Sequence, residues 1–280
     1  MESIGPRKSL QTLVIFSLYL MLRLKFTTRQ IMKINARIIV NADDFGYSES
    51  INKAILKAFQ INIISTTTLI CNMPGFYDAC EIAHRENLTD KIGIHFNLSE
   101  GEPLTELIKR LPKFYKDGQM FKSFKGHLLN NEENNAVLSE LQAQIDRCKK
   151  MGINPTHCDS HHHIHHYWRI GRVFKYLALK NNIPAVRLRF NWGKLSMQRK
   201  LYSGIYNLRL KAASLAKTNY FCEIRSVTPE LLRKKAVIEV MVHPVLNSSG
   251  VLINYVNGSD LYELIKKHLP TNHFINFKTL

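Results

Sequence analysis

The amino-acid sequence predicts an α/β fold, a (β/α) barrel of about seven strands, complete or incomplete. Three observations predict it. Apolar runs of strand length alternate with segments of helical spacing, which indicates parallel strands joined by right-handed crossovers. The chain has 280 residues, enough for one large domain with a substantial core. Clusters of Asp and His follow several strand-like runs, and barrels of this type carry their chemistry at the carboxyl ends of the strands.

Most of the strands are expected where apolar, often β-branched residues are continuous, and the helices where apolar residues recur three and four positions apart. The expected strands cover residues 36–41, 64–71, 91–98, 155–160, 185–190 and 237–242. The expected helices cover residues 50–62, 77–86, 136–151, 168–181 and 259–269. The polar stretch 100–135 contains Gly101, Pro103, Pro112 and Gly118, so we expect an insertion or a lid there.

The first residues are expected to lie outside the fold, with a single catalytic barrel domain over residues 32–280. Residues 10–24 are mostly apolar and follow Arg7 and Lys8, as in a signal peptide, but no small-residue cleavage site is present. The apolar run is also shorter than the roughly 20 residues that a membrane span needs. We therefore expect residues 1–31 to be an N-terminal extension, and a membrane-surface anchor is the alternative.

The overall charge and the cysteines limit the class of protein. The formal charge is +17, but no zinc-finger spacing or RNP-like motif indicates nucleic-acid binding. A basic, solvated surface is the simplest interpretation, beside attraction to anionic lipid or to an acidic substrate.

The five cysteines are an odd number and include no C-x-x-C pair. This favours a reducing compartment over a disulfide framework or a zinc ribbon, so we expect a cytoplasmic protein.

The most basic stretch covers residues 187–217. It contains eight cations and no acidic residue, and Leu195, Leu201, Ile205, Leu208 and Leu215 recur in it at roughly helical spacing. A basic amphipathic helix of this kind can lie on an anionic membrane surface. Alternatively, its apolar side packs on the barrel and its cations face water, which is the interpretation we favour.

Two adjacent carboxylates, Asp43 and Asp44, end the first strand-like run. Charged groups at the end of a buried strand are costly unless a cation meets them. A divalent metal ion would meet them, with one carboxylate as its ligand and the other free to act as a base, and so would an arginine or solvent. A further alternative is an Asp cap on the next turn, with Gly46 at positive φ.

Histidines supply the other candidate residues. Six of the twelve histidines lie between His157 and His166. Strand alternation would place His157, Asp159 and His161 on one face, which combines imidazoles with a carboxylate that orients them. His95, within the strand at 91–98, would alone be interpreted as a hydrogen-bonded core residue. The last strand-like run ends at a further histidine at position 243, directly before a proline.

Together these motifs resemble those of a known family. The runs are Asn-Ala-Asp-Asp-Phe-Gly at 41–46, Gly-Ile-His-Phe-Asn-Leu at 93–98, Thr-His-Cys-Asp-Ser-His-His-His-Ile-His at 156–165 and Met-Val-His-Pro at 241–244. In this order they resemble the YdjC-like carbohydrate deacetylases, which include the chitooligosaccharide deacetylases. The resemblance spans about residues 34–268 and carries no family signature between 191 and 235.

The resemblance implies a distorted, TIM-like (β/α) barrel of the glycoside hydrolase and deacetylase type. It implies that Asp44, His95 and His161 are metal ligands, that Asp43 is the catalytic base, and that His243 is a second catalytic residue. Four further residues are expected behind the ligands without individually assigned roles: His157, Asp159, His163 and His165.

Site and resemblance together predict a hydrolase that removes the acetyl group from an N-acetylated sugar or oligosaccharide with one divalent ion. The ligand set suits Zn²⁺, and Mg²⁺ is also associated with the family. The expected partners are the carbohydrate, a second copy of the chain in a homodimer, and a weak membrane-surface contact, with no nucleic acid. The alternatives are a metal hydrolase for phosphoesters or cyclic amides, a sugar- or metal-binding protein without turnover, and a nucleic-acid or membrane-binding module.

Overall fold

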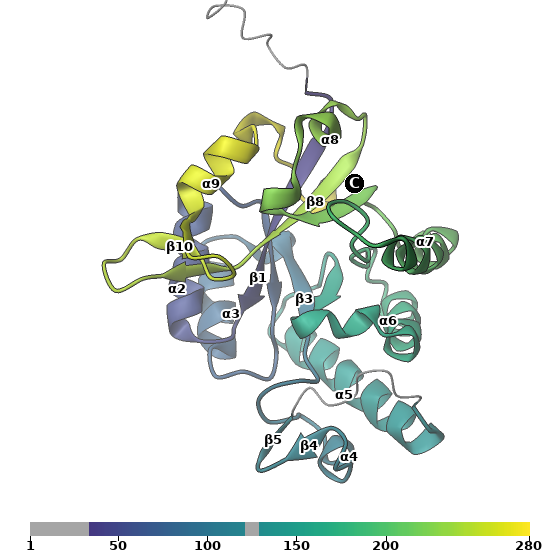
Figure 1. Cartoon of the computed structure of the whole chain (residues 1–280). Coiled ribbons are helices and arrows are strands. Elements are labelled where there is room, and N and C mark those ends of the chain that lie inside the picture. The colour runs from purple at the N-terminus through teal and green to yellow at the C-terminus, as the bar shows by residue number, and fades with distance from the viewer. Residues whose placement is uncertain (1–33, 121–128) are drawn as a thin grey trace, which may run out of the picture.

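The computed structural model describes residues 34–120 and 129–280. Its centre is a six-stranded, wholly parallel sheet that curls into an incomplete barrel (Figure 1). The strand order is β6 (Cys158–Ser160), β3 (Ile92–Phe96), β2 (Thr66–Leu69), β1 (Arg37–Phe45), β8 (Val237–Val242) and β7 (Tyr220–Glu223). The predicted α/β barrel class is therefore confirmed.

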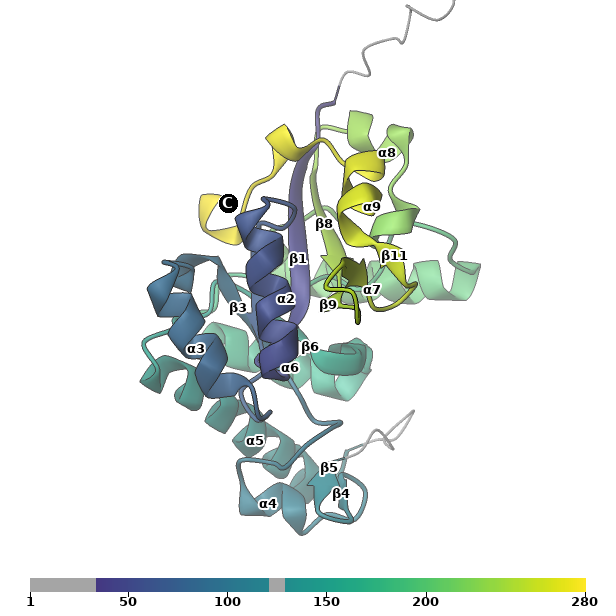
Figure 2. The same cartoon turned by 90° about the vertical axis from the view of Figure 1, so that its left-hand side faces the viewer.

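Helices surround the sheet, with α2 and α3 over one side and α5, α6 and α7 around the other (Figures 1 and 2). The helices of the curled sheet are α2 (Glu49–Gln60), α3 (Phe76–Arg85), α5 (Asn131–Lys150), α6 (Trp168–Lys180), α7 (Met197–Ala212), α8 (Pro229–Arg233) and α9 (Leu261–His268). A small antiparallel sheet follows β8 and consists of β9 (Pro244–Leu246), β10 (Leu252–Asn254) and β11 (Ser259–Asp260). This order of strands and helices places the carboxyl ends of the parallel strands on one side of the barrel.

The central strands form because most of their residues are apolar. Ile38 and Ile39 of β1, which point to opposite faces of the sheet, are fully buried, and so are Ile238 and Val240 of β8. A parallel strand covered by helices has no solvated face, so continuous Ile and Val, whose branched side chains favour extended backbone, are the expected sequence. The pairing of β1 with β8 is regular from Arg37 opposite Val237 to Ala42 opposite Val242.

One predicted strand is wrong and another was missed. Residues 185–190 do not form a strand; they make a single parallel bridge, between Val186 and Cys158. The reason is that β6 has only three residues before the chain turns into a 3₁₀ segment, η2 (His161–His166), so a neighbouring strand has little to pair with. The sheet gains β7 instead, within the region where the sequence showed no signature.

The polar stretch 100–135 is partly structured, as expected of an insertion. It contains α4 (Glu106–Lys109) and a hairpin of β4 (Tyr115–Lys116) and β5 (Gln119–Met120), which lie beyond the carboxyl ends of the central strands (Figures 1 and 2). Helix α5 begins at Asn131, five residues before the expected start at 136. The earlier start has a physical cause, because Asn130 and Glu133 form a capping box at this end of the helix.

Helix α7 corrects the interpretation of the basic stretch that we favoured. Its buried residues are Ser203, Tyr206 and Leu210, whereas Leu201 and Leu208 are 69% and 65% exposed. The side that packs on the barrel is set by close contact with α6, where Gly171 leaves room for the ring of Tyr206. Most of the apolar side of α7 therefore faces away from the barrel.

Three further expectations concern the cysteines, membrane-spanning helices and the N-terminal extension. All five cysteines are buried and free, as their number and spacing suggested. In residues 34–120 and 129–280, no helix combines the length and the apolar composition that crossing a membrane requires. The extension expected over residues 1–31 lies outside the described residues.

Candidate active site and metal centre

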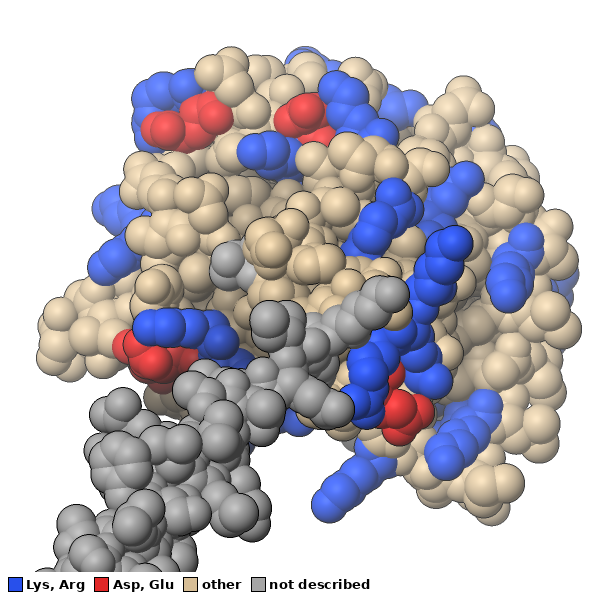
Figure 3. All heavy atoms as spheres, turned by 90° about the horizontal axis from the view of Figure 1, so that it is seen from above, with Lys and Arg blue, Asp and Glu red and all other residues tan. Residues whose placement is uncertain are grey.

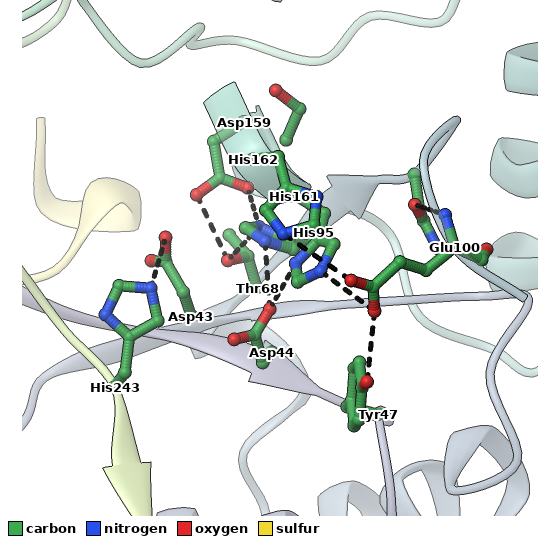
Figure 4. Close-up of polar contacts among 12 residues, drawn as sticks. Asp43, Asp44, Tyr47, Thr68, His95, Glu100, Asp159, His161, His162 and His243 are labelled. Carbon is green, nitrogen blue, oxygen red and sulfur yellow. Dashed lines mark hydrogen bonds and ion pairs between the residues drawn. The ribbon is translucent and has the colours of Figure 1, made fainter. Parts of the chain in front are cut away.

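The candidate site lies at the carboxyl ends of β1, β3, β6 and β8, as expected for a barrel of this type (Figure 4). The strand registers bring its residues together. His95 on β3 is the direct neighbour of Asp159 on β6. The pairing of Ala42 with Val242 puts the next residues of the two strands, Asp43 and His243, side by side, with 3.9 Å between the His243 Nε2 and an Asp43 oxygen.

A local irregularity in β1 separates the two neighbouring aspartates. The register with β2 shifts between Ala42 and Phe45, and Asp44 has a positive φ of 75°. Such a bulge re-aims side chains that would otherwise alternate strictly between the two faces of the sheet. The following helix, α2, is capped by Ser48, so the alternative of an Asp cap is excluded for this helix.

Gly46 holds the turn that carries the aspartates. Its φ is 89°, and a Cβ atom at this position would lie 2.6 Å from the carbonyl oxygen of Ile70. Its N–H donates a 2.7 Å hydrogen bond to the side chain of Asn52, which is buried in α2. A side chain at position 46 would therefore displace the backbone next to Asp44.

The three predicted metal ligands, Asp44, His95 and His161, meet in space. Their ligand atoms all lie within 4.8 Å of one another. Asp44 Oδ1 is 2.8 Å from His161 Nδ1 and 3.3 Å from His95 Nε2. The other ring nitrogen of His161, Nε2, is buried and lies 3.4 Å from an oxygen of Glu100. Two imidazoles and one carboxylate fit a divalent ion with open coordination positions.

Asp159 orients His95 for this role. Its Oδ1 lies 2.6 Å from His95 Nδ1, and Thr68 donates a 3.2 Å hydrogen bond to its other oxygen. A carboxylate behind one ring nitrogen fixes the proton there and leaves the opposite nitrogen free for a metal. Burial alone would lower the pKa of His95, but the charge of Asp159 and its hydrogen bond outweigh burial and raise it to about 10. The surroundings of this ring thus favour a cation.

Asp43 is bound by Arg187. The guanidinium donates two 2.7 Å hydrogen bonds to the two carboxylate oxygens, and Asn41 donates a third, 2.9 Å long. Burial alone would raise the pKa of Asp43, but the charge and hydrogen bonds of Arg187 outweigh burial and hold the pKa well below its ordinary value. Asp43 therefore stays ionised across the physiological pH range.

Arg187 belongs to a buried charge cluster that we did not predict. Besides Asp43, it contacts Asp159 and Glu239, and all four side chains are at most 2% exposed. A signal for it was present in the sequence. Arg187, between the apolar residues Val186 and Leu188, and the lone glutamate in the apolar run 237–242 are each costly to bury unless they meet an opposite charge.

A cavity of about 290 Å³ lies at the candidate site. Asp43, Asp44, His161 and His243 line it, with Tyr47, Glu100, His162 and Tyr255 among the other lining residues. The position of Glu100 was not foreseen, because it follows β3 in the stretch interpreted as an insertion. Its carboxylate accepts a 3.0 Å hydrogen bond from Tyr47 and faces His161 and His162 at 3.4 and 3.5 Å (Figure 4).

Glu100 also enters a second candidate ligand group, with His161 and His162. We favour the group of Asp44, His95 and His161, because Asp159 supports one of its imidazoles from behind. Hydrogen bonding to His161 lowers the pKa of Glu100, so its carboxylate adds negative charge to the mouth of the cavity.

Comparison with known proteins identifies the family. The model of the family described as "YdjC-like protein" matches residues 37–267. The chain belongs to the YdjC-like family. The resemblance predicted from the four motifs is therefore confirmed.

Among the curated relatives of this YdjC-like protein are two bacterial proteins named carbohydrate deacetylase. The protein from Clostridium beijerinckii is 36% identical over 87% of this chain and 96% of its own length. The protein from Halalkalibacterium halodurans is 34% identical over 74% of this chain and 84% of its own length. Both alignments cover most of the relative.

A solved structure confirms the architecture of the YdjC-like chain. The crystal structure of a putative cellobiose-phosphate cleavage protein from Enterococcus faecalis superposes with a TM-score of 0.64 at 21% identity. The match covers 88% of this chain and 98% of that chain. At this identity the likeness concerns the fold alone, and it agrees with the predicted distorted barrel.

The remaining predicted histidines of this YdjC-like protein lie at different depths behind the site. His157 is buried, stacks on Phe277 and lies 3.1 Å from the side-chain oxygen of Asn41, which in turn holds Asp43. His165 pairs with Ser160 of β6. His163 packs its ring against aromatic residues. In the described residues, no hydrogen bond joins His163 or His165 to the three candidate ligands.

Proposed function

We propose that this YdjC-like protein is a metal-dependent hydrolase that removes the acetyl group from an N-acetylated sugar. One observation carries the proposal: Asp44, His95 and His161 converge, and two of them, Asp44 and His161, line the same cavity as Asp43 and His243. The names of the two curated relatives support a carbohydrate as the substrate class. The proposal that the reaction needs a metal rests on the two imidazoles and the carboxylate of the site.

The residues divide the work according to their surroundings. A divalent ion at Asp44, His95 and His161 would lower the pKa of a water molecule and polarise the acetamide carbonyl. Asp43 would accept the proton of that water, because Arg187 holds its carboxylate ionised and fixed in position. Arg187 also makes Asp43 a weak base, so its action depends on the acidification of the water.

His243 is our candidate for the general acid. An amine is a poor leaving group, so the nitrogen of the sugar must be protonated as its bond to the acetyl carbon breaks. His243 lines the cavity, and its Nε2 lies 3.9 Å from Asp43. Because this distance is longer than a hydrogen bond, the proton gained by Asp43 would pass to His243 through one water molecule, and His243 would deliver it to the leaving nitrogen. The products would be acetate and a free amino sugar.

The cavity limits how much of the substrate is enclosed. Its volume of about 290 Å³ lies at the lower end of the range of small-molecule pockets, which is roughly 300–1,000 Å³. We propose that one acetamido sugar ring enters the cavity and that the rest of an oligosaccharide stays outside. Tyr47 and Glu100 at its wall would accept or donate hydrogen bonds to sugar hydroxyl groups.

The test is acetate release across N-acetylated mono- and oligosaccharides, before and after chelation and with Zn²⁺ or Mg²⁺ added back. We expect release that chelation abolishes and that one of the two ions restores. A phosphoester and a cyclic amide in the same panel test the rival hydrolases. Turnover of either without acetate release, or acetate release that chelation leaves unchanged, would contradict the proposal.

A further inference from the structure

Helix α7 exposes a continuous apolar stripe on the side that faces away from the barrel. Met197, Leu201, Ile205 and Leu208 follow one another at four-, four- and three-residue spacing, so they lie on one face of the helix. They are 79%, 69%, 47% and 65% exposed. The residues that anchor α7 to the barrel lie on the opposite face. The stripe is thus not part of the packing of this domain.

Cations border the stripe. At 3.6 residues per turn, Lys200 and Lys211 fall along one flank of the stripe and Arg209 along the other. No acidic residue occurs anywhere between residues 187 and 217. Figure 3 shows Lys and Arg gathering on the side of the molecule that carries α7 and α8, with few Asp or Glu among them. Such long side chains can lie along an apolar surface while their charges reach outward.

A tryptophan extends the apolar surface to α6. Trp168 is 39% exposed, the Arg209 guanidinium lies 4.0 Å above its ring, and the Tyr202 ring is 6.2 Å away. Tryptophan and tyrosine beside cations are typical of the level at which a protein meets lipid headgroups. Aliphatic, aromatic and cationic side chains therefore occur together on one outward face.

We propose that the outer face of α7, with Trp168, docks on an anionic membrane surface. Charge complementarity decides between the occupants. A second copy of the chain would bring the same cations face to face without acidic partners from residues 187–217. The N-terminal segment is also cationic, with Arg7, Lys8 and Arg23 in its sequence. Of these three occupants, only anionic lipid offers opposite charge to the cations that border the stripe and an apolar interior to the stripe itself.

The test is cosedimentation of the full-length protein with vesicles of phosphatidylcholine, alone or mixed with phosphatidylglycerol, at low and high salt. We expect binding to the anionic vesicles that weakens as salt screens the charges. Replacing Lys200 and Lys211 by Gln should reduce the partition coefficient by roughly fivefold per cation. Replacing Leu201 and Leu208 by Ser should reduce binding also at low salt, because the apolar contact is lost.

The matched control replaces two exposed lysines on other faces, Lys53 on α2 and Lys116 on β4, by Gln. It should bind like the original protein. The replaced side chains of all three variants are exposed, and circular dichroism should show an unchanged fold. Absence of binding to anionic vesicles at low salt would overturn the proposal. So would binding that the Leu variant retains in full, which would locate the contact elsewhere, or a dimer by light scattering that only the Leu variant loses, which would assign the stripe to a second copy.

Discussion

Arg187 and Asp43 form a two-pronged ion pair, with two hydrogen bonds of 2.7 Å, inside the barrel. Neither side chain is more than 2% exposed. The same guanidinium meets Asp159, which orients His95, and Glu239 from β8. The guanidinium of Arg187 thus stabilises both the proposed base, Asp43, and Asp159, which lies behind the proposed ligand His95. One buried charge therefore affects both the core and the site.

Replacing Arg187 by Met should destabilise the protein strongly. Three carboxylates would remain buried without their shared cation, and breaking buried pairs of this kind costs ~3–5 kcal/mol. Urea unfolding measures the change in the free energy of unfolding. The control is Arg189→Met, two residues away, because Arg189 is only half-buried and bonds the backbone of His166. Equal losses in the two variants would contradict the role given to Arg187.

Asp159→Asn should weaken metal binding without removing a ligand. The neutral amide no longer holds the proton on His95 Nδ1 by charge, and residues behind metal ligands typically contribute ~10–100-fold in affinity. Titration of the metal-free protein with Zn²⁺ measures the effect. Ser160→Ala is the control from the same strand, since Ser160 bonds His165 and not a ligand. Unchanged affinity in Asp159→Asn would refute the proposed support of His95.

Glu239 should make the stability depend on pH. Burial raises its pKa to about 7 against the opposing charge of Arg187, from an ordinary value of 4.5. Because the folded pKa is the higher one, the protonated form favours the folded state. Its contribution is present below about pH 4.5 and is lost as pH rises through about 7. Between about pH 5 and about pH 8, Glu239→Gln should remove on the order of 2–3 kcal/mol of the pH-dependent change in the free energy of unfolding. Urea unfolding at about pH 5 and about pH 8 tests this, and identical pH dependence in both proteins would exclude it.

A shortened chain that starts at Met32 should fold and retain activity. The N–H groups of Asn35 and Ala36 donate hydrogen bonds to the carbonyl of Leu232, which secures the start of β1. Thermal unfolding and acetate release of the shortened and full chains provide the comparison. An insoluble or inactive shortened chain beside a healthy full chain would show that residues 1–31 belong to the domain.

The sequence was informative where local patterns determine structure. Most of the parallel strands appear as apolar runs, and two of them lead directly to Asp43 and His243. Alternation along residues 157–161 predicted the odd-numbered side chains on one face, and in the structure Asp159 contacts His95 and His161 contacts Asp44. These features depend on neighbours in sequence or on the period of a strand.

Features that depend on distant neighbours were not foreseen. The partners of Arg187 come from β1, β6 and β8, and no spacing along the chain announces them. The spacing of Leu201 and Leu208 predicted an apolar side of a helix but not whether this side faces the barrel or solvent. The contact between Tyr206 and Gly171 decides the orientation of the helix. Strand β7 was missed because Tyr220–Glu223 has only four residues, and only Phe221 and Cys222 of them are buried.

The division of labour between the neighbouring aspartates is the central claim. Metal content by mass spectrometry, with acetate release on the same samples, tests it in Asp43→Asn and Asp44→Asn. We predict that Asp44→Asn loses bound metal and activity together. Asp43→Asn should keep its metal while turnover falls ~10²–10⁴-fold, as expected when a general base is removed. Stoichiometric metal in Asp44→Asn, or loss of metal from Asp43→Asn, would contradict this assignment.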